Sequence, residues 1–157
     1  MKTLKISEQD AKRYYPTASD EFRTVLETTF GKEFFSEKIT DKIKSWNDVI
    51  LELGVGNVIL PYSENMVLTK QQKSINALYK IQCITKVLNE GWESDFSNSN
   101  EDKYYPWFEY KKSGWSLASV FYGYVDAHFP FGCYYKTKQL AEHSVKFFID
   151  IYKEYLP

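Results

Sequence analysis

The sequence predicts an α+β fold in which a three-stranded antiparallel meander packs with a central helix and a C-terminal helix, preceded by short N-terminal helices. A change of period along the chain supports this prediction. Apolar residues recur at helical spacing in residues 69–91 and again in residues 137–155. Between these runs, residues 106–124 alternate with a period of two and are rich in aromatic and β-branched side chains, which is typical of strands.

The chain of 157 residues has the usual length of one domain. We therefore interpret residues 1–157 as a single domain, with a helical N-terminal part in residues 1–60 and a helix–meander–helix core in residues 69–157. The N-terminal part is expected to hold three short helices, each with a capping side chain before it and a Gly or Pro after it. They run from Ser7 to Pro16, from Ser19 or Asp20 to Gly31, and from Ser45 to Gly54.

The central helix is the clearest predicted element. Thr69 and Gln72 have the spacing of a capping box, and Gly91 ends the helix. Its apolar residues form two stripes, Ala77, Ile81, Ile84 and Leu88 on one side and Ile75, Tyr79 and Cys83 on the other. A helix that is apolar on two sides packs on both, so we expect this helix to be the spine of the fold.

The strands follow the central helix. Pro106–Lys112 and Trp115–Tyr124 are predicted to pair as a hairpin through a turn at Ser113-Gly114. Gly132–Lys136 is predicted as the third strand. The last helix is expected from about Thr137 to Tyr155, with apolar residues on one face.

The ends of the chain and its cysteines bear on its compartment. The opening residues MKTLKISEQD lack the apolar segment of a secretory signal, and no apolar run approaches the ~18 residues of a membrane span. Cys83 and Cys133 stand far apart without a CxxC motif, so we expect buried free thiols. These observations predict a cytoplasmic protein with no membrane partner.

Candidates for catalysis are few. Asp126, His128 and Cys133 are the only cluster of side chains suited to metal binding or nucleophilic chemistry. Zinc sites need three or four ligands at tight spacing, and His143 belongs to a different element. The acidic loop from Glu90 to Asp102 departs from the EF-hand pattern and is expected to be solvated. We therefore expect no metal, no cofactor and no catalytic residue.

The second half of the chain carries a recognisable pattern. The central helix ends in LNEGW at residues 88–92, a strand begins with KYYPWF at 103–108, and the final helix opens with KTKQLAE at 136–142. Over about residues 72–157 the chain thereby resembles a family of uncharacterised small proteins of phages and integrated elements in gut bacteria. The resemblance implies a phage or mobile-element origin. It implies no reaction and no catalytic residues.

Aromatic residues make up 18% of the chain, more than one face of a three-stranded sheet needs. Alternation places Trp107 and Glu109 on one face and Phe108 and Tyr110 on the other. Helices are expected to cover one face. The other face is either covered by the N-terminal helices or open for protein docking or base stacking. The candidate binding residues are Trp92, Tyr104, Tyr105, Trp107, Tyr110, Tyr122 and Tyr124.

The favoured hypothesis is a non-enzymatic binding module that acts through the aromatic sheet face, on a protein partner or by self-association. The alternative is single-stranded nucleic-acid binding, in which Lys103, Lys111, Lys112 and Lys136 contact phosphates. The net charge of −1, from 20 Lys and Arg against 21 Asp and Glu, disfavours this alternative. A small enzyme built on the three candidates named above is the third hypothesis.

Overall fold

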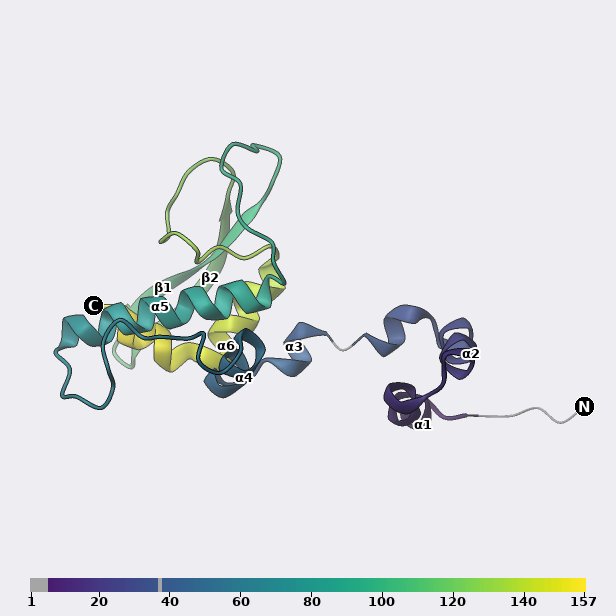
Figure 1. Ribbon diagram of the computed structural model, residues 1–157. Coiled ribbons are helices and arrows are strands. Elements are labelled where there is room, and N and C mark those ends of the chain that lie inside the picture. Colours follow the sequence, from purple (N-terminus) through teal and green to yellow (C-terminus); the bar gives the residue numbers. More distant parts are fainter. Residues whose placement is uncertain (1–5, 37) are drawn as a thin grey trace, which may run out of the picture. The chain divides into compact units, whose positions relative to one another are not determined.

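The computed structural model describes residues 6–36 and 38–157 (Figure 1). The chain divides into two compactly packed units, Met1–Lys38 and Ile39–Pro157, which are described separately below. The interpretation of residues 1–157 as a single domain differs from this division. Residues 39–60, which we grouped with the helical N-terminal part, pack within the second unit.

The first unit is helical. Its elements are α1 (Glu8–Tyr14), the 3-10 helix η1 (Tyr15–Thr17), α2 (Asp20–Phe30) and the 3-10 helix η2 (Lys32–Phe35). Ser7 and Ser19 cap α1 and α2 as predicted, since each hydroxyl accepts a backbone N–H from the first turn. The Tyr15 and Phe35 rings stack with centroids 4.2 Å apart.

The second unit holds the remaining elements, and Figure 1 shows its two long helices side by side. In chain order they are α3 (Ile39–Lys42), α4 (Trp46–Leu53), α5 (Lys70–Leu88), β1 (Lys103–Lys111), β2 (Gly114–Gly123) and α6 (Lys138–Tyr155). The hairpin of β1 and β2 packs on α6, and α3 and α4 pack on α5. The structure is therefore α+β, as the sequence predicts.

Helix α5 is the spine of this unit. The Thr69 hydroxyl accepts the Gln72 N–H, and the Gln72 side chain accepts the Thr69 N–H, which confirms the capping box. Ile84 and Leu88 join a core that includes residues of α3, α4, β2 and α6. Ile81 joins a second cluster with residues of α6 and the segment before it. Both sides of the helix are thus packed.

The strands β1 and β2 form the predicted antiparallel hairpin. Lys111 pairs with Gly114, so the turn is Lys112-Ser113, one residue earlier than predicted. Gly114 has φ +97°, in the left-handed region that favours glycine. The register shifts between Trp107 and Phe108, where β2 inserts Ala118 as the extra residue of a β-bulge.

The predicted third strand, residues 132–136, is wrong. This segment makes one isolated bridge, in which the backbones of Tyr104 and Tyr135 exchange two hydrogen bonds of 3.0 and 2.7 Å. The ladder stops because Cys133 donates its N–H to the preceding turn and Thr137 is already the N-cap of α6. The sheet therefore has two strands.

A side chain replaces the missing neighbour of the bridged segment. The buried amide of Asn89, the C-cap of α5, donates to the Tyr134 carbonyl at 2.8 Å and accepts the Lys136 N–H at 3.0 Å. Asn89 thus satisfies the backbone groups that face α5, as a strand would. This contact fixes the segment between the spine helix and β1.

Candidate functional site

The two faces of the hairpin differ in what covers them. Cross-strand partners point to the same face, so Tyr104, Phe108 and Leu117 share one face, which we call the inner face. The Phe108 ring lies 5.1 Å from the Tyr152 ring of α6, and Leu117 packs in both core clusters. The middle of the inner face therefore belongs to the core.

The opposite, outer face holds Tyr105, Trp107 and Glu109 of β1 with Ser119 and Phe121 of β2. These assignments confirm the alternation predicted for β1. Tyr105 is the only one of these residues that is fully covered, with 6% of its surface exposed.

The segment 128–134 covers Tyr105, whose ring centroid lies 5.9 Å from that of His128, 6.1 Å from that of Phe129 and 5.7 Å from that of Tyr134. The Tyr134 hydroxyl fastens this segment by accepting the Phe129 N–H and donating to the Phe129 carbonyl. Residues after β2 thus provide this cover.

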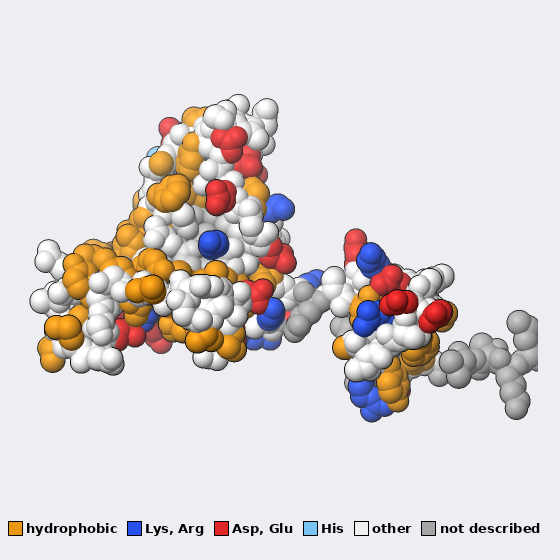
Figure 2. Space-filling model, viewed as in Figure 1, with side chains coloured by type: hydrophobic (Ala, Val, Ile, Leu, Met, Phe, Trp, Pro, Cys, Tyr) orange, Lys and Arg blue, Asp and Glu red, His pale blue; other side chains and the backbone are white. Residues whose placement is uncertain are grey.

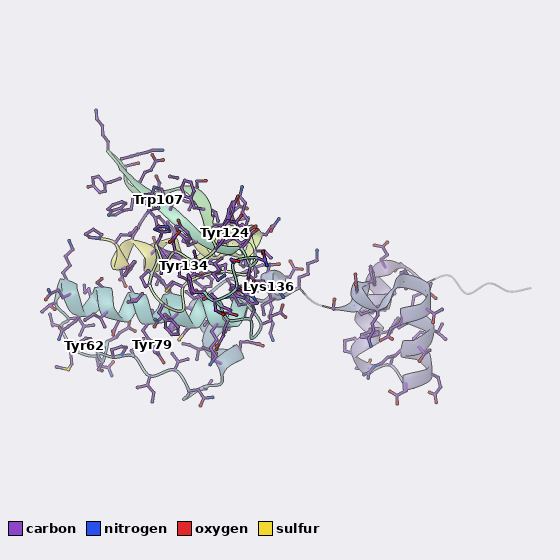
Figure 3. All side chains as sticks on the ribbon, turned by 90° about the horizontal axis from the view of Figure 1, so that it is seen from above. Tyr62, Tyr79, Trp107, Tyr124, Tyr134 and Lys136 are labelled. Carbon is purple, nitrogen blue, oxygen red and sulfur yellow. The ribbon has the colours of Figure 1, made fainter. Side chains whose placement is uncertain are left out.

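Beyond this cover, the outer face is open. Trp107 is 51% exposed and Phe121 is 47% exposed, and their rings meet edge to face with centroids 5.7 Å apart. We call these two residues the outer-face pair. Figure 3 labels Trp107 on the hairpin and Tyr134 in the covering segment. Phe121 was absent from the predicted binding residues, although its cross-strand partner Tyr105 was among them.

The tip of the hairpin carries Tyr110, which is 70% exposed. Its ring meets that of Trp115, its cross-strand partner, at 5.2 Å. The Trp115 indole N–H donates to the carbonyl of Pro157 at 2.9 Å, so the tip is tied to the last residue of the chain. Tyr110 is separated from the outer-face pair because it belongs to the inner face.

The other predicted residues lie at the opposite end of the hairpin. The rings of Tyr104, Tyr122 and Tyr124 form a chain with centroid distances of 5.7 and 5.6 Å. The Tyr104 hydroxyl donates to Asp102 at 2.9 Å, and this bond to a carboxylate raises the pKa of Tyr104. A hydrogen bond with Tyr122 is the main cause of the raised pKa of Tyr124.

An open groove of about 790 Å³ lies beside Tyr104 and Tyr122 at the N-terminus of α6. Tyr104, Tyr122, Trp92, Asp102 and Lys136 line it, among others. The Trp92 indole N–H already donates to Glu101 at 3.2 Å. The predicted residues therefore lie at separate places. Trp92, Tyr104 and Tyr122 line this groove, Trp107 belongs to the outer-face pair, and Tyr110 lies at the tip.

The acidic loop between α5 and β1 surrounds the ammonium group of Lys103. The Lys103 ammonium is fully buried and donates to the carbonyls of Asn98 and Glu101 at 3.1 and 2.9 Å. The Glu101 carboxylate lies 3.4 Å away, and the Phe96 ring is 5.4 Å from the ammonium. Lys103 thus organises the loop that was expected to be solvated, and it is not available for a phosphate contact.

The three catalytic candidates do not form a site. Asp126 and His128 are exposed, while Cys133 is fully buried, and burial raises the pKa of its thiol to about 12. His143 lies on α6, where its Nε2 is 2.6 Å from the Ile43 carbonyl. Within residues 6–36 and 38–157, no three His, Cys, Asp or Glu side chains gather in a way suited to a metal ion. Cys83 and Cys133 are buried free thiols, as predicted.

A cluster of buried hydroxyl groups had no signal in the sequence. The Tyr135 hydroxyl lies 2.6 Å from Ser144 Oγ and 2.7 Å from the Tyr152 hydroxyl, and Ser144 is 3.0 Å from Tyr152. Burial raises the pKa of Tyr135 to about 12 and raises that of Tyr152 as well. The three groups satisfy one another inside the core, where no substrate reaches them.

Comparisons with known proteins provide no evidence on the function of the chain. No protein-family model, curated protein or solved structure matches it. The resemblance to phage-encoded proteins over residues 72–157 therefore stays a prediction. Among the helices of the described residues, none combines the length and apolar character that crossing a membrane requires.

Proposed function

We propose that this protein is a non-enzymatic binding module, of phage or mobile-element type, that recognises another protein through the outer face of its hairpin. The observation that carries the proposal is the exposure of Trp107 and Phe121 on a face whose remaining aromatic ring, Tyr105, is fully covered. Exposed aromatic pairs on a rigid strand are favourable anchors, because they bury large areas and lose little conformational entropy on binding. The origin follows from the resemblance of residues 72–157.

The charges beside this pair favour a protein over a single-stranded nucleic acid. Glu109 shares the outer face with Trp107, and its carboxylate pairs with Lys111 at 2.5 Å. Lys103 is buried and engaged, which removes one of the four lysines suited to phosphates. Figure 2 shows basic side chains scattered among acidic ones on the visible face rather than gathered in a patch. A phosphate-binding surface normally gathers basic side chains into one patch, which this face does not show.

An enzyme has the least support. A nucleophilic cysteine requires an accessible thiol with a lowered pKa and a base beside it. Cys133 is buried with a raised pKa, and its sulfur contacts the carbonyl of Phe131 at 3.7 Å. Asp126 and His128 stay at the surface without a third partner of the same kind among the described residues.

The proposal is tested with the full chain as bait and with the double variant Trp107→Ser/Phe121→Ser. We expect wild-type protein to retain a defined set of proteins from the bacterium that carries the gene, and the double variant to lose them. Tyr110→Ser is the matched control, because it removes an exposed aromatic ring from the tip and leaves the outer face intact. Circular dichroism confirms that each variant is folded. Equal retention by wild type and the double variant contradicts the proposal.

Titration with single-stranded oligonucleotides at about 50 mM salt addresses the alternative, since electrostatic binding is strongest there. Binding in the micromolar range that weakens steeply with salt, and that the double variant loses, would replace the proposed function with nucleic-acid recognition. No binding leaves protein recognition as the role of the outer face.

A further inference from the structure

The two edges of the sheet differ. β1 is flanked at its start by the bridge to Tyr135, which closes that edge beside Tyr104. β2 pairs with β1 on one side only. In the described part of the chain, no other backbone or side-chain group forms a hydrogen bond with the β2 backbone. The edge of β2 that points away from β1, which we call the outer edge, therefore presents unpaired N–H and C=O groups.

Natural edge strands usually carry features that prevent pairing with another strand, such as a lysine, a proline or a short length. β2, with the sequence GWSLASVFYG, is ten residues long and contains no charged residue and no proline. The only such feature is the bulge at Ala118. Beyond it, Ser119, Phe121 and Tyr122 are exposed.

From these observations we infer that the outer edge of β2 pairs antiparallel with β2 of a second copy, which joins two hairpins into one continuous sheet. This inference goes beyond the proposed function, which concerns the outer face, and names a partner for the edge of β2. A two-fold contact brings the same strand against itself, so any charge on the strand would face a like charge nearby. Because β2 is uncharged along its whole length, it meets its own copy without this repulsion.

The geometry of such a pair has a consequence for the outer face. Two antiparallel copies of one strand in one sheet are related by a two-fold axis perpendicular to the sheet, so equivalent faces lie on the same side. The outer-face pairs of both copies, Trp107 and Phe121, then face the same direction. Self-association through the edge would therefore double the exposed aromatic surface and leave it accessible.

The test measures sedimentation and amide hydrogen exchange of the full chain from about 10 µM to 1 mM, the range expected for a small interface. We expect a concentration-dependent dimer in which β2 amides gain protection as dimer forms. Ser119→Lys, which places a charge at the middle of β2, should weaken dimerisation at least tenfold. Ser113→Lys, the same change in the adjacent turn, should have no such effect.

A monomer at every concentration, or a dimer whose β2 amides stay unprotected, overturns the inference. A dimer that is lost in Trp107→Ser/Phe121→Ser but kept in Ser119→Lys overturns it too, because the face rather than the edge then makes the contact. The retention experiment is independent. If the chain is monomeric and the double variant still loses its partners, edge pairing fails while the proposed function stands. If it dimerises through β2 and retains no outer-face partner, the proposed function fails instead.

Discussion

The two units of the chain differ in how they bury their apolar side chains. In the second unit, α5 presents apolar residues on two sides, and helices, strands and the 128–135 segment converge on it. In the first unit, the hydrophobic residues that are buried, among those described, are Ala11 and Leu26. Its aromatic rings instead stack on one another near the surface.

This difference shows that aromatic content alone does not make a core. A core forms where elements with apolar stripes meet, and a unit below about 40 residues has too little buried surface for much stability. We therefore expect the second unit to carry nearly all the folding free energy. The first unit is expected to contribute little folding free energy and to unfold readily.

The largest decrease in the free energy of unfolding should follow from a substitution that creates a cavity in the core of the second unit. Ile84→Ala removes fully buried methyl groups and should lower the free energy of unfolding by about 2–5 kcal/mol. Leu26→Ala, its counterpart in the first unit, should leave the second unit unchanged. All four tryptophans lie in the second unit, so their fluorescence during denaturation reports on that unit alone. If Leu26→Ala shifts this transition as much as Ile84→Ala does, the two units are not independent.

The elements of the second unit were predictable where the signal is local. Thr69 and Gln72 are three residues apart, and the hairpin follows from alternation beside a Gly-containing turn. The covering of Tyr105 by residues 128–134 was not predictable, because it depends on where a loop without periodicity folds back. The outer face was consequently expected to be either covered or open, whereas it is covered at Tyr105 and open at Trp107.

The buried hydrogen bonds of Asn89 and Lys103 were not predicted, for a similar reason. Asn89 binds backbone groups 45 and 47 residues further along the chain, and a sequence does not show that separation. Lys103 follows the acidic loop directly, so its position was visible, but a lysine is almost never fully buried unless paired. A phosphate contact from Lys103, as the nucleic-acid hypothesis requires, would need an exposed ammonium, and the burial of Lys103 removes it.

Removal of the Lys103 ammonium should cause the second-largest decrease in the free energy of unfolding. Lys103→Met keeps much of the apolar stem but leaves two carbonyls and the Glu101 carboxylate without their cation. Breaking a buried ion pair costs about 3–5 kcal/mol, and we expect the lower end because Glu101 is partly exposed. Lys111→Met, at the exposed tip, is the control and should change stability by less than about 0.5 kcal/mol. Chemical denaturation measures both, and equal stabilities would show that the loop does not depend on Lys103.

A smaller effect is expected at the bridged segment. Asn89→Ala leaves the Tyr134 carbonyl and the Lys136 N–H unpaired, which should cost about 2 kcal/mol. Hydrogen exchange should accelerate at Tyr135 and Lys136, because the segment loses its attachment to α5. Asn47→Ala, on the exposed side of α4, should leave exchange unchanged. Unaltered protection of Tyr135 would show that its bridge to Tyr104 holds the segment without Asn89.

The smallest effect concerns pH and the acidic loop. The backbone N–H of Asp95, donating to the Glu101 carboxylate at 3.0 Å, is the main cause of the lowered pKa of Glu101, aided by the Trp92 indole and Lys103. A carboxyl whose pKa is lower in the folded state stabilises the fold above its unfolded pKa, and this contribution is lost as the pH falls through the folded value.

The loop should therefore loosen below about pH 4, near the ordinary pKa of glutamate, while the helical core stays folded. The NMR signals of the Asp95 amide and the Trp92 indole should move together along this titration. Glu101→Gln should abolish the shared titration, because the amide keeps an acceptor but gains no charge. Glu93→Gln, an exposed change in the same loop, should leave it as in wild type. If the indole signal titrates in Glu101→Gln as it does in wild type, Glu101 is not the group that couples this loop to pH.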